Sequence, residues 1–146
     1  MIKESTIDQE IELVSNKVDE NILDFVAEEK SFSGYLLGDD FHLLTEVEKE
    51  TMLFIHLVIY RSILKEEKGK KFDPKKFQAI EDKNWEQFNW KGKSWKEKMD
   101  LMFDGYKEEE LLAFTEDMLN DESISDLARE LIFVTAKSYI DVKIKN

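Results

Sequence analysis

The apolar residues of this chain recur every three or four positions between its five glycines and its single proline. This spacing places them on one face of an α-helix. No stretch alternates apolar and polar residues over the length of a β-strand, with the β-branched side chains that strands favour. The pattern therefore predicts an all-α protein, a compact helical bundle or array of about six helices.

Capping signals and breakers give the expected helix boundaries. Thr45 with Glu48, and Ser94 with Glu97, match the capping box, in which each N-terminal hydroxyl is followed three residues later by a glutamate. Asp73 suits an N-cap, and Pro74 suits the first helical position. The expected helices span residues 6–29, 41 or 45–67, 74–88, 94–105, 107–119, and 123 or 125–142, and residues 30–40 are expected to form a loop.

Length and composition fit one folded unit. The 146 residues are near the usual size of a domain, which predicts a single all-helical domain over residues 1–146. The hydrophobic content of 42% argues against disorder, and the lack of cysteine excludes disulfides, thiolate catalysis and cysteine-based zinc sites. The longest apolar run, 52–60, is far shorter than the roughly 20 residues of a membrane span, and the start lacks an apolar leader. We therefore expect a cytoplasmic protein that does not cross a membrane.

The formal charge of −12 is unevenly distributed along the chain. Residues 1–64 carry a net charge of −9, residues 65–98 carry +4, and residues 99–146 carry −7. The overall charge makes nucleic acid an unlikely partner because it repels phosphate. The basic middle segment either marks a partner surface or packs beside the acidic ends and neutralises them, and we favour the second interpretation.

His56 lies in the most hydrophobic stretch of the chain, residues 48–64. The helix expected there is apolar nearly all round, which is typical of a central, buried helix. A catalytic or metal-bound imidazole needs a carboxylate or a second ligand nearby, and Glu48 and Glu50 are not one or two turns away on its face. We expect His56 to be buried and neutral, with one hydrogen-bond partner.

An alternative hypothesis makes the same helix an active site. Glu46 and Glu50 stand one turn apart, and paired carboxylates can perform acid–base chemistry or bind a hard cation. Together with His56 and Tyr60 they are the candidate catalytic residues of a helical enzyme or ligand-binding domain. At a helix start, however, such carboxylates more often serve to stabilise the helix, through their favourable interaction with the positive end of the helix dipole.

No motif for a metal or cofactor is present in the sequence. There is no Glu-x-x-His pair of the kind that helical di-iron proteins use, and the acidic residues 116–126 do not fit the ligand spacing of a calcium-binding EF-hand. No glycine-rich phosphate loop or nucleophile elbow occurs either. We therefore predict neither a cofactor nor a bound metal.

The three tryptophans fall together in the basic segment, as Trp85, Trp90 and Trp95, and Lys91 and Lys93 lie between the last two. The simplest interpretation is that the rings pack against neighbouring helices and that lysine stems lie over them. A contact surface for a protein partner is the second possibility, since tryptophan is enriched in interface hot spots. Stacking of nucleic-acid bases is the third.

These features leave three functional hypotheses. The leading one is a small acidic interaction or regulatory protein without enzymatic activity, whose protein partner is either another protein or a second copy of the chain in a homodimer. The second is the helical enzyme or ligand-binding domain described above. The third is an acidic inhibitor that mimics the charge of nucleic acid toward a basic, nucleic-acid-binding partner.

Overall fold

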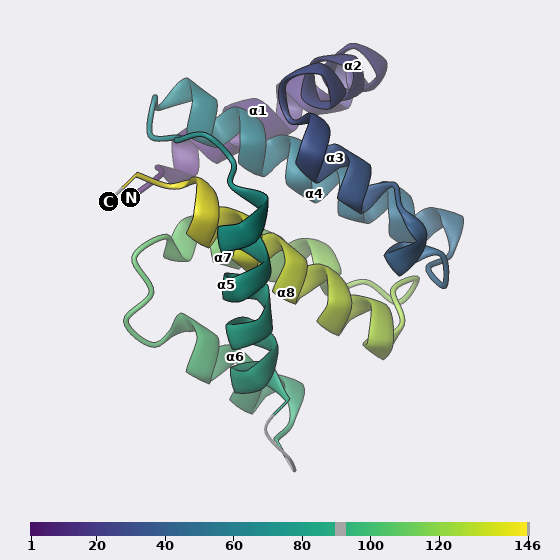
Figure 1. Cartoon of the computed structure of the whole chain (residues 1–146), viewed down its shortest axis with the longest axis vertical. Coiled ribbons are helices and arrows are strands. Elements are labelled where there is room, and N and C mark those ends of the chain that lie inside the picture. The colour runs from purple at the N-terminus through teal and green to yellow at the C-terminus, as the bar shows by residue number, and fades with distance from the viewer. Residues whose placement is uncertain (90–92, 146) are drawn as a thin grey trace.

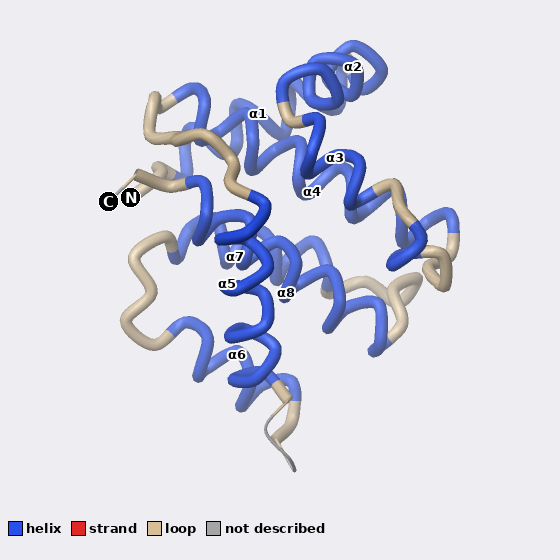
Figure 2. Tube along the Cα trace, in the orientation of Figure 1, coloured by secondary structure: helices blue, strands red, loops and turns tan. Residues whose placement is uncertain are grey.

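The computed structural model describes residues 1–89 and 93–145, and within them the fold is all-α, with 75% helix and no strand (Figures 1 and 2). The predicted fold class is thus confirmed. The α-helices are α1 Glu4–Asn16, α2 Val18–Glu28, α3 Lys30–Leu36, α4 Glu46–Lys65, α5 Pro74–Phe88, α6 Trp95–Phe103, α7 Glu109–Leu119 and α8 Asp126–Lys143, and a short 3-10 helix covers Asp39–Phe41.

The described part of the chain has more helices than predicted, and one reason is that the first expected helix is divided into α1 and α2. It breaks at Lys17, whose φ of −139° and ψ of 54° are not helical and whose backbone N–H bonds back to the carbonyls of Leu13 and Val14. The break turns α2 away from the line of α1 (Figure 1). As a result Phe25 of α2 is fully buried, with its ring centre 5.4 Å from that of Tyr60 on α4.

The expected loop at residues 30–40 instead forms α3 and the 3-10 helix. Gly34, Gly38 and several polar residues in this segment resemble a turn signal, but Phe32 and Leu36 are spaced four apart and both are buried. Their burial stabilises a helix that local propensity disfavours. Gly38 follows α3, and a Cβ atom there would lie 3.2 Å from the carbonyl oxygens of Gly34 and Tyr35.

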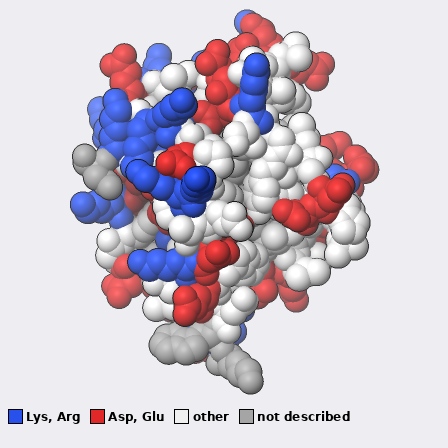
Figure 3. Space-filling model, viewed as in Figure 1, with Lys and Arg blue, Asp and Glu red and all other residues white. Residues whose placement is uncertain are grey.

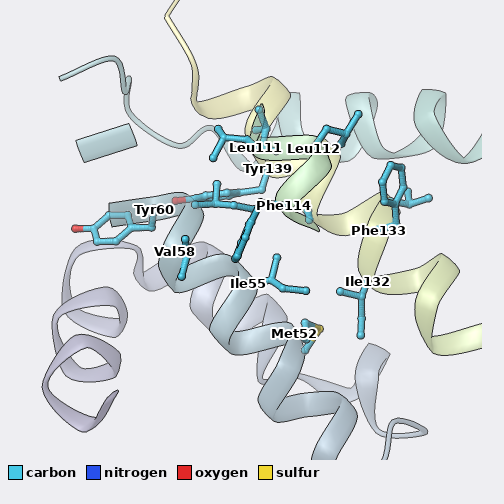
Figure 4. Packing of buried hydrophobic residues seen from close by; sticks show 14 of the residues in the cluster. Met52, Ile55, Val58, Tyr60, Leu111, Leu112, Phe114, Ile132, Phe133 and Tyr139 are labelled. Carbon is cyan, nitrogen blue, oxygen red and sulfur yellow. The ribbon is translucent and has the colours of Figure 1, made fainter. Parts of the chain in front are cut away.

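Two long helices, α4 and α8, form the centre of the molecule. α1 and α2 pack on α4, α5 packs on α8, and α7 contacts both central helices. Figure 4 shows Ile55 and Val58 of α4 in the same cluster as Ile132 and Phe133 of α8. Residues 132–140 of α8 are all buried, so this helix is covered on every side. The prediction that the helix carrying His56 is central and buried is confirmed.

Most of the predicted capping signals are present as hydrogen bonds. The Thr45 amide donates to Glu48 Oε1 at 2.9 Å, and the Glu48 amide donates to Thr45 Oγ1 at 3.2 Å. The same arrangement joins Ser94 and Glu97 at the start of α6. Glu48 has a second role, because its Oε2 accepts the Ser125 amide at 2.8 Å and so links the start of α4 to the start of α8.

No helix in the described part of the chain is long and apolar enough to span a membrane.

We predict that the two capping boxes contribute very differently to stability. Glu48 is buried and accepts the backbone amides that cap two different helices, whereas Glu97 is exposed and, among the described residues, accepts only from Ser94. Glu48→Ala should lower the free energy of unfolding by about 3 kcal/mol, since it leaves two amides without their charged acceptor. Glu97→Ala should cost about 1 kcal/mol or less.

Urea unfolding followed by circular dichroism measures both values. Equal losses for the two variants would show that the contact between Glu48 and Ser125 does not couple α4 to α8.

Candidate functional site

His56 is fully buried in the core between the rings of Phe32 and Tyr139, whose centres lie 5.3 and 5.9 Å from its own. Its Nδ1 is 2.7 Å from the carbonyl oxygen of Met52, so Nδ1 carries the proton and donates it. Burial lowers the pKa of His56 to about 4, although the bond to Met52 opposes the shift. The expectation of a buried histidine with one backbone partner is confirmed.

The other candidate catalytic residues do not converge on His56. The Glu46 side chain is 88% exposed and lies 4.0 Å from Lys49, and Glu50 is also exposed. Tyr60 is one turn beyond His56, with its ring against Phe25. The predicted interior constellation is therefore not formed, because the two carboxylates belong to the solvent-facing side of α4.

No cluster of three or more metal-binding side chains was found in the described part of the chain.

The tryptophan segment lies partly against the core. Trp95 is half-buried, with its ring centre 5.7 Å from that of Phe133 and the Arg129 guanidinium 4.4 Å above it. Trp85 is also half-buried and meets Phe88 edge to face at 6.0 Å. Lys93 is half-buried. The remaining two candidate contact residues, Trp90 and Lys91, lie outside the described residues.

A buried polar network that the sequence did not reveal joins α5 and α8. Lys137 Nζ donates to Asn84 Oδ1 at 3.1 Å and to Asp141 Oδ2 at 3.0 Å, and Asn84 Nδ2 donates to Ser138 Oγ at 3.0 Å. The Tyr106 hydroxyl donates to Asp141 Oδ1 at 2.6 Å. Burial and the Asp141 carboxylate raise the pKa of Tyr106, so it stays protonated. Because these groups satisfy one another, we interpret the network as a clamp between helices.

The sequence contained one signal for this network. Lys137 and Asp141 are four residues apart among the mostly apolar residues 131–144 of the chain, a position that requires partners for both charges. Asn84 and Tyr106 are far away in the sequence, so nothing local identified them as those partners.

An apolar groove of about 550 Å³ lies between α2, α4 and α7. Apart from Glu50 and Thr51, its lining is hydrophobic: Val18, Ile22, Leu53, Phe54, Leu57 and Met118. Val18 is 41% exposed, and Ile22, Leu53, Phe54 and Met118 are half-buried. Such a continuous apolar surface rimmed by polar residues is typical of a protein contact site.

The walls of this groove are strongly acidic. α2 and α7 each carry four acidic side chains and no lysine or arginine. Glu50 of α4 adds a carboxylate to the lining itself. The groove therefore combines an apolar lining with strongly acidic helices on two of its sides.

Comparison of this chain with protein-family models, curated proteins and solved structures finds no match. A functional proposal therefore rests on the geometry and charge of the molecule.

We predict that Trp95 contributes to folding. Trp95→Ala removes contacts with Phe88, Phe133 and Arg129, and should lower the free energy of unfolding by about 3 kcal/mol, the lower end for buried aromatic residues. Leu127→Ala, at an exposed position of α8, is the matched control and should cost about 0.5 kcal/mol or less. Chemical denaturation gives both values, and a loss below about 1 kcal/mol for Trp95→Ala would favour a contact role instead.

We also predict an acid-sensitive contribution from His56. Its pKa of about 4 in the folded state lies below its ordinary 6.5, so below pH 6.5 the unfolded chain gains a proton that the folded chain does not. The free energy of unfolding should therefore fall between pH 6.5 and pH 4, by up to about 3 kcal/mol. His56→Gln should lack this part of the pH dependence, although it is less stable at pH 7.

Both proteins are unfolded with urea at several pH values. The difference between their free energies of unfolding at each pH gives the contribution of His56, because the carboxylates are the same in both proteins. Titration of the imidazole by NMR is the direct check, and a folded pKa above 6.5 would contradict the prediction.

Proposed function

We propose that this protein is a non-enzymatic binding protein, and that its apolar groove between α2, α4 and α7 takes the apolar face of a basic amphipathic helix from a partner protein. The observation that supports this proposal is the groove itself. Leu53, Phe54 and Met118 form its floor, and the helices on two of its sides, α2 and α7, contain no lysine or arginine. Helices that bind grooves of this kind insert apolar residues spaced three or four apart.

Charge selects the partner. A basic helix would place lysine or arginine side chains beside the carboxylates of α2 and α7, which speeds association and opposes acidic competitors. A second copy of this chain is a poor occupant, because the same acidic helices flank its groove and each copy has a charge of −12. Nucleic acid is disfavoured for the same reason.

The test uses designed peptides as probes. A labelled helix with leucine on one face and lysine on the other should bind the protein, as measured by fluorescence anisotropy, and should bind less tightly as salt is added. A peptide of the same composition in scrambled order has no apolar face and should bind much more weakly. A third peptide with glutamate in place of lysine should not bind.

Matched variants locate the site. Val18 lines the groove, whereas Leu23 lies on the same helix, is 71% exposed and does not line it. Val18→Lys should weaken binding by at least about tenfold, or about 1.4 kcal/mol, through repulsion and lost apolar contact. Leu23→Lys makes the same charge change and should have little effect.

Several outcomes would overturn the proposal. Equal effects of Val18→Lys and Leu23→Lys would show only general attraction between opposite charges, and equal binding of the ordered and scrambled peptides would show the same. A dimer in analytical ultracentrifugation that Val18→Lys dissociates would assign the groove to a second copy of the chain.

A further inference from the structure

A short backbone bridge brings lysines from two distant parts of the chain together. The Lys70 amide donates to the Lys143 carbonyl at 2.8 Å, and the Lys145 amide donates to the Lys68 carbonyl at 2.8 Å. Gly69 allows this approach, since a Cβ atom there would lie 2.9 Å from Ile63 Cγ2. Lysine and arginine side chains gather on the side of the molecule where this loop and the C-terminus lie (Figures 1 and 3).

These lysines surround a hollow of about 450 Å³, which we call the lysine hollow. Its lining includes four lysines, three carboxylates and an apolar wall: Lys70, Lys71, Lys143, Lys145, Glu28, Glu29, Glu67, Tyr60, Ile63 and Leu64. Glu29 is paired with Lys143, which leaves three lysines against two exposed carboxylates. The hollow is thus locally positive in a chain whose net charge is −12.

The inner end of the lysine hollow is built from buried charged groups. Lys143 is 8% exposed, and its Nζ donates to Glu29 Oε1 at 2.7 Å. An ammonium group has three N–H donors, and Glu29 is the only acceptor within hydrogen-bonding distance of this one in the described part of the chain. The ion pair fixes Lys143 in place and leaves donor capacity on its Nζ.

The Glu29 carboxylate also lies beside the buried hydroxyl of Tyr139. Burial, the Glu29 charge and a hydrogen bond to Glu29 raise the pKa of Tyr139, so the hydroxyl stays protonated. Glu29 is thus held by Lys143 and Tyr139, and the donor capacity that remains at the inner end of the hollow is that of Lys143 Nζ.

We infer that the lysine hollow binds a small organic phosphate. The phosphate groups would lie between Lys143 at the inner end and three lysines at the rim, Lys70, Lys71 and Lys145. The ammonium groups of these lysines match the negative charge of a phosphate and donate hydrogen bonds to its oxygens. The body of the ligand would pack against the apolar wall formed by Tyr60, Ile63 and Leu64. Because Lys143 is almost completely buried, only a small group can reach it, which favours a free metabolite over a nucleic-acid strand.

The probes are inorganic pyrophosphate and adenosine diphosphate, added to the isotope-labelled full chain and followed by NMR. Both should shift the backbone amides of the bridge, at residues 69–71 and 143–145, and adenosine diphosphate should also shift the Tyr60 ring signals and bind more tightly. Removal of two rim lysines in Lys70→Gln/Lys71→Gln should weaken the binding of both probes by at least about tenfold. Lys143→Gln is not used, because it would leave Glu29 buried without its ion pair.

The matched control is Lys75→Gln/Lys76→Gln, which makes the same charge change at two exposed lysines of α5 that do not line the hollow. This control should change the affinity by no more than about twofold. The inference is overturned if neither probe shifts the NMR signals of the bridge amides, or if the shifted signals belong to lysines over the whole surface. It is also overturned if the two double variants lose equal affinity for the probes. Tighter binding of a single-stranded oligonucleotide than of adenosine diphosphate would also overturn it.

Discussion

The stacked rings of Phe32 and Tyr139, with centres 4.3 Å apart, are the contact on which the arrangement of the helices depends. Phe32 comes from α3 and Tyr139 from the middle of α8, and both are fully buried. His56 of α4 and Phe77 of α5 meet the same ring of Phe32 at 5.3 Å. Phe25 of α2 meets it edge to face at 6.3 Å. One aromatic side chain therefore touches four further helices, and its removal would expose apolar surface on all of them.

α4 connects this core to both proposed sites. On one side it contributes Ile55 and His56 to the interior, and on another it contributes Leu53 and Phe54 to the apolar groove. Near its C-terminal end, Tyr60 forms part of the lysine hollow. Unlike α8, α4 is not covered on every side, and the groove is where part of its apolar surface stays accessible.

The two proposed sites have opposite electrostatic character. The groove is walled by α2 and α7, which carry no cation. The lysine hollow is lined by two lysines from the basic segment, by Lys143 at the end of α8 and by Lys145 just after it. The basic segment also neutralises acidic surface elsewhere, because Lys98 pairs with Glu130 at 2.8 Å. The favoured interpretation of the charge pattern, in which the basic segment neutralises acidic parts of the chain, therefore has a physical counterpart in the fold at Lys98.

The sequence by itself determined the features that depend on near neighbours. Thr45 and Asp73 were identified as helix starts because a cap bonds residues two or three positions away, and His56 was expected to be buried because its own helix surrounds it with apolar residues. Only the tertiary structure decided the break at Lys17, the helix at Lys30–Leu36, the Lys137 network and the meeting of Lys70 with Lys143. Each of these is stabilised by contacts between residues far apart in the chain, and such contacts outweigh local propensity once apolar surface is buried.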